Sequence, residues 1–322
     1  MGGISETTVA RLQNLFSDID EAAEFFAQKP LLAHYTSISN AESILKNKEI
    51  WFSNPLYLND SEELRFGLSQ GQDLILFDDE AEQLLLKALG NQAHLDELRE
   101  NFEKIFKTYE DEFAIDTFVL SFCNHKPDDA DGKLSMWRGY GANGNGACIV
   151  FDGSQLAETE DSPLILGRMY YASHEQRVFQ MRKYIAILCE ELQRAPNGKY
   201  DIFSAAWYYF ERIKLFALFT KHAGFSEEEE WRVVYLPERD KEKLLTAFID
   251  YHITPTGIQP KLKLPIKPLA GVTPSDLDIE QLERFLCCLN RFCCQISLVC
   301  DSTWLLARRP DSDATTSFHG FT

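Results

Sequence analysis

The chain alternates short strand-like segments with longer amphipathic segments, and this alternation constrains its fold more than any other feature. Apolar residues recur every second position in the short segments and every third or fourth position in the long ones. Short strands separated by helices favour a mixed α+β domain with small, mainly antiparallel sheets and helical insertions. We expect strands at 31–35, 49–53, 117–123, 146–151, 164–172, 231–236, 261–266, 269–272 and 295–301, and helices at 5–27, 40–46, 84–89, 95–109, 174–193, 201–221 and 276–293.

These segments group into one large domain with flanking pieces. We expect an N-terminal helix at 1–30, a single α+β domain at 31–309 and a flexible tail at 310–322. Residues 60–112 contain 15 acidic and 5 basic side chains, a net charge of −10, in helix-type patterns. Such a charge run is typical of a solvated helical insertion. A pair of helices is expected at 173–221.

The acidic balance of the whole chain limits the classes of partner. Its 322 residues contain 32 Lys and Arg against 50 Asp and Glu, a formal net charge of −18. A protein that follows a phosphate backbone needs a basic face, so we do not expect extended nucleic-acid binding. A local basic cleft that binds a small anion is compatible with this net charge, because net charge describes solubility and steering rather than a particular site. No apolar run approaches the roughly 20 residues of a membrane span, so we expect no membrane partner.

The eight cysteines favour a reducing compartment. Four of them lie in the segment 287–294, whose apolar residues recur at helical spacing. Cysteines six or seven positions apart on one helix cannot surround zinc tetrahedrally, so we expect buried thiols and no metal. The N-terminus has no basic segment followed by an apolar one, so we expect no signal peptide. Free thiols in such a chain predict a cytoplasmic location.

His34 and Tyr35 form the first candidate site, at the end of a predicted strand. A histidine there can hydrogen-bond a ligand hydroxyl, and a tyrosine can stack on a flat ring. The structural alternative is a core histidine beside a packing tyrosine.

Residues 134–146 form the second candidate site. This segment contains the G-x-G-x-x-G motif of dinucleotide-binding proteins, at Gly139, Gly141 and Gly144. That motif requires a helix after it, whereas the sequence here predicts a strand. We therefore reject that interpretation and expect a flexible loop carrying Arg138 and Tyr140. Arg138 can clamp a phosphate through two hydrogen bonds, and an ordinary surface arginine is the alternative.

The third candidate site is a run of glutamates that leads into a predicted strand. Like charges in sequence usually form a solvated face. Here, an extended backbone would place Glu228, Glu230 and Arg232 on one face and Trp231 on the other. A carboxylate beside an arginine can hold a ribose hydroxyl or stabilise a developing cation.

Four sequence blocks occur in an order that resembles a large bacterial family, the domain of unknown function 2971. The resemblance covers roughly residues 30–309. The blocks are His34-Tyr35-Thr36 with Trp51-x-Ser53-Asn54-Pro55, then Asn59-Asp60-x-Glu62, then Ser135-Met136-Trp137-x-x-Tyr140 with Gly146, and then Lys221-x-x-x-Phe225-x-x-Glu228-x-Glu230-Trp231-Arg232.

That family in turn is similar to the ADP-ribosyltransferases. This resemblance implies an ADP-ribosyltransferase-like fold and NAD as substrate, without a metal. It implies that His34 holds the ribose, that Tyr35 or Tyr140 stacks on nicotinamide, and that Glu230 contacts the ribose 2′-hydroxyl. In this scheme Glu228 assists Glu230, Arg232 orients it, Arg138 binds pyrophosphate and Thr36 lies in the same nucleotide-binding block. The Ser-Thr-Ser block of that superfamily has no counterpart here.

The resemblance predicts an enzyme that cleaves the nicotinamide–ribose bond. It would pass ADP-ribose to a macromolecule that the sequence does not identify, or to water, in the manner of a defence or toxin effector. Two alternatives stay open. One is a module on the same fold that binds a nucleotide or a partner without catalysis. The other is a phosphoesterase or nuclease that relies on carboxylates.

Overall fold

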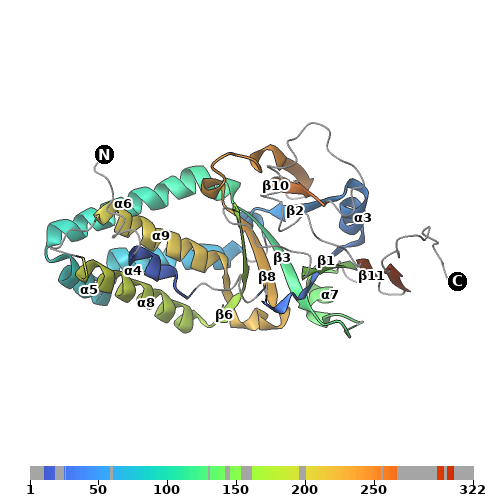
Figure 1. Cartoon of the computed structure of the whole chain (residues 1–322), viewed down its shortest axis with the longest axis horizontal. Coiled ribbons are helices and arrows are strands. Elements are labelled where there is room, and N and C mark those ends of the chain that lie inside the picture. Colours follow the sequence, from blue (N-terminus) through green and yellow to red (C-terminus); the bar gives the residue numbers. More distant parts are fainter. Residues whose placement is uncertain are drawn as a thin grey trace. The chain divides into compact units, whose positions relative to one another are not determined.

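A computed structural model describes most of the chain (Figure 1). The described residues are 11–18, 25, 27–58, 61–129, 131–141, 146–153, 162–195, 201–254 and 257–266, and, for the backbone only, 296–300 and 303–307. The chain divides into two compact units. Unit 1 comprises 1–24, 52–120 and 162–263, and unit 2 comprises 25–51, 121–161 and 264–322. The expected mixed α+β class is confirmed, while the predicted domain limits stay predictions.

The long helices of unit 1 run alongside one another (Figure 1). α9 packs against α4 and α6, and α8 packs against α5 and α4. Their apolar faces form the larger core cluster of the described residues. The bounds are α4 Ser61–Phe77, α5 Asp79–Leu89, α6 Gln92–Thr108, α8 His174–Gln193 and α9 Ile202–Leu218, with a short 3-10 helix η1 at Gln13–Phe16.

Side-chain caps begin several of these helices. Asp78 accepts a hydrogen bond from the backbone N–H of Ala81 at the start of α5, at 2.9 Å. Ser173 and Gln176 form a reciprocal capping box at the start of α8. Each cap satisfies a backbone donor that the helix itself leaves unpaired, and contributes about 1 kcal/mol.

The described part of the acidic segment, 61–112, is largely helical as expected, but it also supplies core. Phe102 of α6 has no exposed surface. Its ring centroid lies 5.7 Å from that of Tyr209 and 6.2 Å from that of Phe210, both on α9. Burying an aromatic side chain of this size contributes roughly 1.5–3 kcal/mol. The charged residues are therefore the outer face of helices that stabilise unit 1.

Two glycines allow α4 and α9 to approach closely. A Cβ at Gly67 would lie 2.6 Å from the Cβ of Ala217, and one at Gly71 would collide with Ile213. Glycine inside a helix costs about 0.5–1 kcal/mol relative to alanine. That cost is offset here because the two helix backbones pack directly against each other.

Besides these helices, unit 1 contains short strands that pair with one another, some antiparallel and some parallel. β5 and β8 are antiparallel, with Gly167 opposite Arg232. β6 and β7 are parallel, with Tyr171 opposite Lys221. The bounds are β5 Leu164–Arg168, β6 Tyr170–Ala172, β7 Thr220–His222, β8 Glu230–Tyr235, β9 Ile249–Thr254 and β10 Gly257–Pro265, the last two forming an antiparallel pair.

Asn54 fixes the chain that follows β2 (Glu49–Ser53). Its amide nitrogen donates to the carbonyl oxygens of Ala114, Ile115 and Thr117 at 2.7, 2.9 and 3.0 Å. Its Oδ1 accepts from the backbone N–H of Leu56 at 2.9 Å. Asn54 has no exposed surface, so these bonds replace water for its buried side-chain amide.

Unit 2 contains β1 (Leu31–Ser37) paired antiparallel with both β3 (Phe118–His125) and β4 (Gly146–Asp152). Ala33 lies opposite Cys123, and Tyr35 lies opposite Cys148. These residues form a small core with Val150. The other elements assigned here are α3 Ile38–Asn47 and α7 Leu134–Tyr140, and the antiparallel pair β11 Ile296–Cys300 and β12 Thr303–Ala307.

Several expected boundaries change. The helix predicted at 201–221 ends at Leu218, and Lys221 lies on β7 instead, because the chain pairs with β6 after α9. The predicted strand 269–272, the helix 276–293 with its cysteines, and the tail 310–322 lie outside the described residues. Among the described helices, none combines the length and apolar character that crossing a bilayer needs.

Candidate functional site

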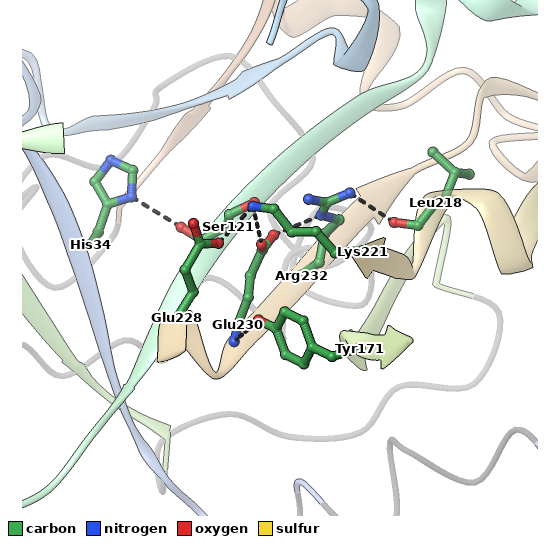
Figure 2. Close-up of polar contacts among 8 residues, drawn as sticks. All are labelled: His34, Ser121, Tyr171, Leu218, Lys221, Glu228, Glu230 and Arg232. Carbon is green, nitrogen blue, oxygen red and sulfur yellow. Dashed lines mark hydrogen bonds and ion pairs between the residues drawn. The ribbon is translucent and has the colours of Figure 1, made fainter. Parts of the chain in front are cut away.

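A buried group of charged side chains lies where β7 and β8 begin, and we call it the charged cluster (Figure 2). It consists of Lys221, Glu228, Glu230 and Arg232. Lys221 Nζ donates to Glu228 Oε2 at 2.6 Å and to Glu230 Oε2 at 3.4 Å. Arg232 Nε donates to Glu230 Oε1 at 2.8 Å. All four belong to unit 1.

The local backbone explains why two carboxylates converge. The 3-10 helix η8 ends at Glu228, and β8 begins at Glu230. Glu229 between them has φ 44°, ψ 51°, the left-handed conformation that costs a non-glycine residue roughly 1–2 kcal/mol. This reversal, rather than the extended backbone predicted from the sequence, directs both carboxylates to Lys221. Trp231, expected on the opposite face, is buried at 1 % exposure.

The charges of the cluster balance. Two carboxylates face one ammonium and one guanidinium, and the four residues are only 2–9 % exposed. Balance is required because an unpaired charge this deeply buried would cost several kcal/mol. Arg232 Nη1 also donates to the Leu218 carbonyl oxygen at 2.8 Å, which holds the guanidinium in place.

Tyr171 and Lys221 complete the site, and the sequence assigned neither of them a role. The hydroxyl oxygen of Tyr171 accepts from the Glu230 backbone N–H at 2.8 Å, and burial raises the pKa of this hydroxyl. Tyr171 lies on β6, 59 residues from Glu230, so no local sequence signal could have connected them. Lys221 begins the fourth sequence block, where the sequence pattern predicts only the end of a helix.

His34 lies in unit 2, on β1. Its Nδ1 is 3.2 Å from the Ser121 carbonyl oxygen (Figure 2). Burial lowers the pKa of the His34 imidazole, so the ring is neutral near pH 7. A carbonyl oxygen can only accept, which assigns the proton to Nδ1 and makes Nε2 the acceptor of the ring. His34 is therefore prepared to accept a hydrogen bond from a hydroxyl.

Tyr35 is part of the small core of unit 2. It is 5 % exposed, and its ring meets that of Trp137 edge-on, with centroids 4.9 Å apart. Its hydroxyl oxygen accepts from the Lys133 backbone N–H at 2.9 Å. Thr36 is also buried, and its Oγ1 accepts from Asn40 Nδ2 at 3.2 Å. These contacts favour the structural interpretation of Tyr35, a packing tyrosine.

Arg138 and Tyr140 lie on a helix and not on the flexible loop that the glycines predicted. Both belong to α7, whose C-terminal cap is Gly141. The glycines mark the end of this helix rather than a phosphate-binding turn, and β4 follows them as expected. Both side chains are exposed, Tyr140 at 40 %. Tyr140 is thus the more accessible of the two tyrosines predicted to stack on a ligand.

The remaining predicted features give no further site. Asn59 and Asp60 lie outside the described residues. Within the described ranges, no three His, Cys, Asp or Glu side chains are grouped as metal ligands would be. Cys123 and Cys148 are buried, and burial raises the pKa of the Cys148 thiol to about 12. The Cys148 thiol is therefore protonated near neutral pH, and both cysteines belong to the core.

The fold and the cluster define a mixed α+β protein with a buried, charge-balanced pair of carboxylates. The model of a family described as protein of unknown function (DUF2971) matches residues 136–233 of this chain. That segment contains most of the third sequence block and the whole charged cluster, so the family recognition is confirmed there, while the first two blocks lie outside the matched residues. Searches of curated proteins and of solved structures found no match.

Proposed function

We propose that this protein is an NAD-consuming, ADP-ribosyltransferase-like enzyme that cleaves the bond between nicotinamide and ribose. One observation carries the proposal. Glu230 begins a strand, and its carboxylate is oriented from both sides by Arg232 at 2.8 Å and Lys221 at 3.4 Å. A fixed carboxylate in a site of low polarity stabilises developing positive charge better than the same group in water.

The chemistry follows from the bond that breaks. The electron pair of the C1′–N bond leaves with nicotinamide, which becomes neutral, and positive charge develops on the ribose. Glu230 stabilises that charge, and a hydroxyl or amine of the acceptor then bonds C1′ and loses its proton.

Access to Glu230 requires a rearrangement. The residue is 3 % exposed. Of its two cation contacts, the one to Lys221 is the longer and the one that a ribose hydroxyl can most easily replace. A carboxylate offers about four acceptor positions, so Glu230 can keep Arg232 while it accepts from substrate.

The same burial favours a second candidate, a module that binds a nucleotide or a partner without turnover. Each Glu230 oxygen already accepts a hydrogen bond inside the protein. A carboxylate so satisfied can act as a structural ion pair. In that case ligand binding survives neutralisation of Glu230.

The experiment is a nicotinamide-release assay on the full chain with NAD, with and without cell extract as a source of acceptor. Glu230→Gln is compared with Glu227→Gln, which makes the same change of charge at an exposed neighbour. The enzyme proposal expects release by the wild type and Glu227→Gln. It also expects a loss of at least about 100-fold in a folded Glu230→Gln. Calorimetry measures NAD binding by the same proteins.

Each outcome decides between the candidates. NAD binding without turnover, retained in Glu230→Gln, establishes the binding module. Neither turnover nor binding by the wild type refutes both. Turnover that a folded Glu230→Gln keeps refutes the role of Glu230.

A further inference from the structure

Unit 1 contains a cavity separate from the charged cluster. Its volume is about 260 Å³, it is partly open, and it is lined by Asp18, β5, β6, β7, the middle of α8 and the C-terminal part of α9. That volume equals the share of about nine water molecules in liquid water, at the small end of ligand pockets. No member of the charged cluster lines it. Thr220 lines it while its neighbour Lys221 belongs to the cluster, since successive side chains of a strand point to opposite sides.

The walls of the cavity are mainly aromatic. Tyr184 and Phe216 meet edge-on with ring centroids 5.6 Å apart, and the rings of Tyr170 and Phe216 are 6.3 Å apart. Leu215 and Phe219 add apolar surface. Walls of this kind favour a flat, apolar body over a sugar or a phosphate.

Two buried polar atoms on these walls lack a partner. They are Arg212 Nε and Thr220 Oγ1, for which the described residues supply no hydrogen bond. Both residues line the cavity, and they are 5 % and 4 % exposed. An unsatisfied buried polar atom costs free energy, and here two such atoms belong to residues that line one cavity. Arg212 Nε can only donate, whereas Thr220 Oγ1 can donate or accept.

The charge of Arg212 is already compensated. Its Nη2 donates to both carboxylate oxygens of Asp18, at 3.0 and 2.8 Å, and to the Tyr184 hydroxyl. Its guanidinium carbon also lies 3.9 Å from the centre of the Tyr184 ring. A ligand carboxylate would place a second anion beside Asp18, whereas a neutral carbonyl oxygen accepts from Nε without that repulsion.

We propose that this cavity binds a small, neutral aromatic carboxamide. The ring packs among the aromatic walls, the amide oxygen accepts from Arg212 Nε, and the amide N–H donates to Thr220 Oγ1. This single functional group satisfies both unpaired atoms. The proposal goes beyond the proposed function, because it holds whether or not the protein cleaves NAD.

The test is a binding titration of the full chain by ligand-observed NMR, with benzamide and benzoate as probes. Benzamide is small enough for the cavity, because its number of non-hydrogen atoms is close to the number of water molecules that the cavity volume corresponds to. For a ligand of this size we expect a Kd of roughly 1 mM. We expect benzoate to bind about 10-fold more weakly. Thr220→Val, which keeps the side-chain shape, weakens benzamide about 5-fold, while Thr220→Ser restores it.

Two further variants locate the binding. Leu215→Phe fills part of the cavity and abolishes benzamide binding. Thr254→Val removes a hydroxyl on β9, away from the cavity lining, and changes nothing. Circular dichroism establishes that each variant is folded. The absence of benzamide binding overturns the proposal. So does binding that both Thr220→Val and Leu215→Phe leave unchanged, or benzoate binding as tight as that of benzamide.

Discussion

Lys221 is the ammonium shared by two buried carboxylates, and Lys221→Met measures how much the charged cluster depends on that balance. Methionine keeps most of the length and the apolar stem of lysine, so packing changes little. What disappears is one positive charge between Glu228 and Glu230. The cluster then has two carboxylates and a single guanidinium, that of Arg232.

The distances set the magnitude. At an effective dielectric constant of about 20, contacts of 2.6 and 3.4 Å correspond to gross attractions of about 6 and about 5 kcal/mol. Desolvation of the three charges offsets most of this attraction, at several kcal/mol each. Removing one partner, however, leaves the carboxylates desolvated without their cation. We therefore expect the free energy of unfolding to fall by about 3–5 kcal/mol near pH 7.

The loss should depend on pH. Two carboxylates that share one guanidinium repel each other, and one of them takes up a proton more readily in the folded variant than in the unfolded chain. The folded state then holds more protons, so the free energy of unfolding rises as the pH falls. The difference from the wild type should therefore be smaller near pH 5 than near pH 7.

Urea unfolding followed by far-UV circular dichroism measures both effects. Lys263→Met is the matched control, because Lys263 pairs at 2.7 Å with Asp250, whose side chain is 64 % exposed. An exposed pair contributes about 0–1 kcal/mol. If Lys221→Met costs no more than Lys263→Met, or if its cost grows toward acid pH, the cluster is not a desolvated, charge-balanced unit and the reasoning is refuted.

Two other predictions concern stability. Asn54→Ala removes the donor to three carbonyl oxygens, one of them on the fully buried Thr117, and should cost about 3 kcal/mol in urea unfolding. The exposed Asn47→Ala should cost at most about 0.5 kcal/mol, and equal costs would contradict this role of Asn54. Burial lowers the pKa of His34, so the unfolded chain binds the extra proton below about pH 6.5 and the free energy of unfolding falls with the pH. His34→Gln should make that fall shallower in acid unfolding without abolishing it, since burial also lowers the pKa of His125. An unchanged slope would show that His34 does not contribute.

Much of the local structure was predictable because its causes are local. The strand at 49–53 and the helix at 174–193 have the expected bounds, since alternation, caps and breakers determine them. The glycines around 140 predict a loop, but Gly139 lies within the helix α7 and Gly141 caps it. The left-handed Glu229 was missed because nothing in a run of four glutamates marks which one reverses the chain.

The mixed α+β class, most of the helices and strands, the resemblance to the family and the candidate residues Glu228, Glu230 and Arg232 all followed from the sequence alone. These features depend on the periodicity of apolar residues and on sequence blocks, both of which are visible without a structure. Tertiary structure decided what surrounds those residues. It brought Tyr171 to the backbone of Glu230 and Lys221 between two carboxylates, and it placed Arg212 and Thr220 on the walls of one cavity. Contacts of this kind depend on packing between elements distant in sequence, and no local propensity encodes them.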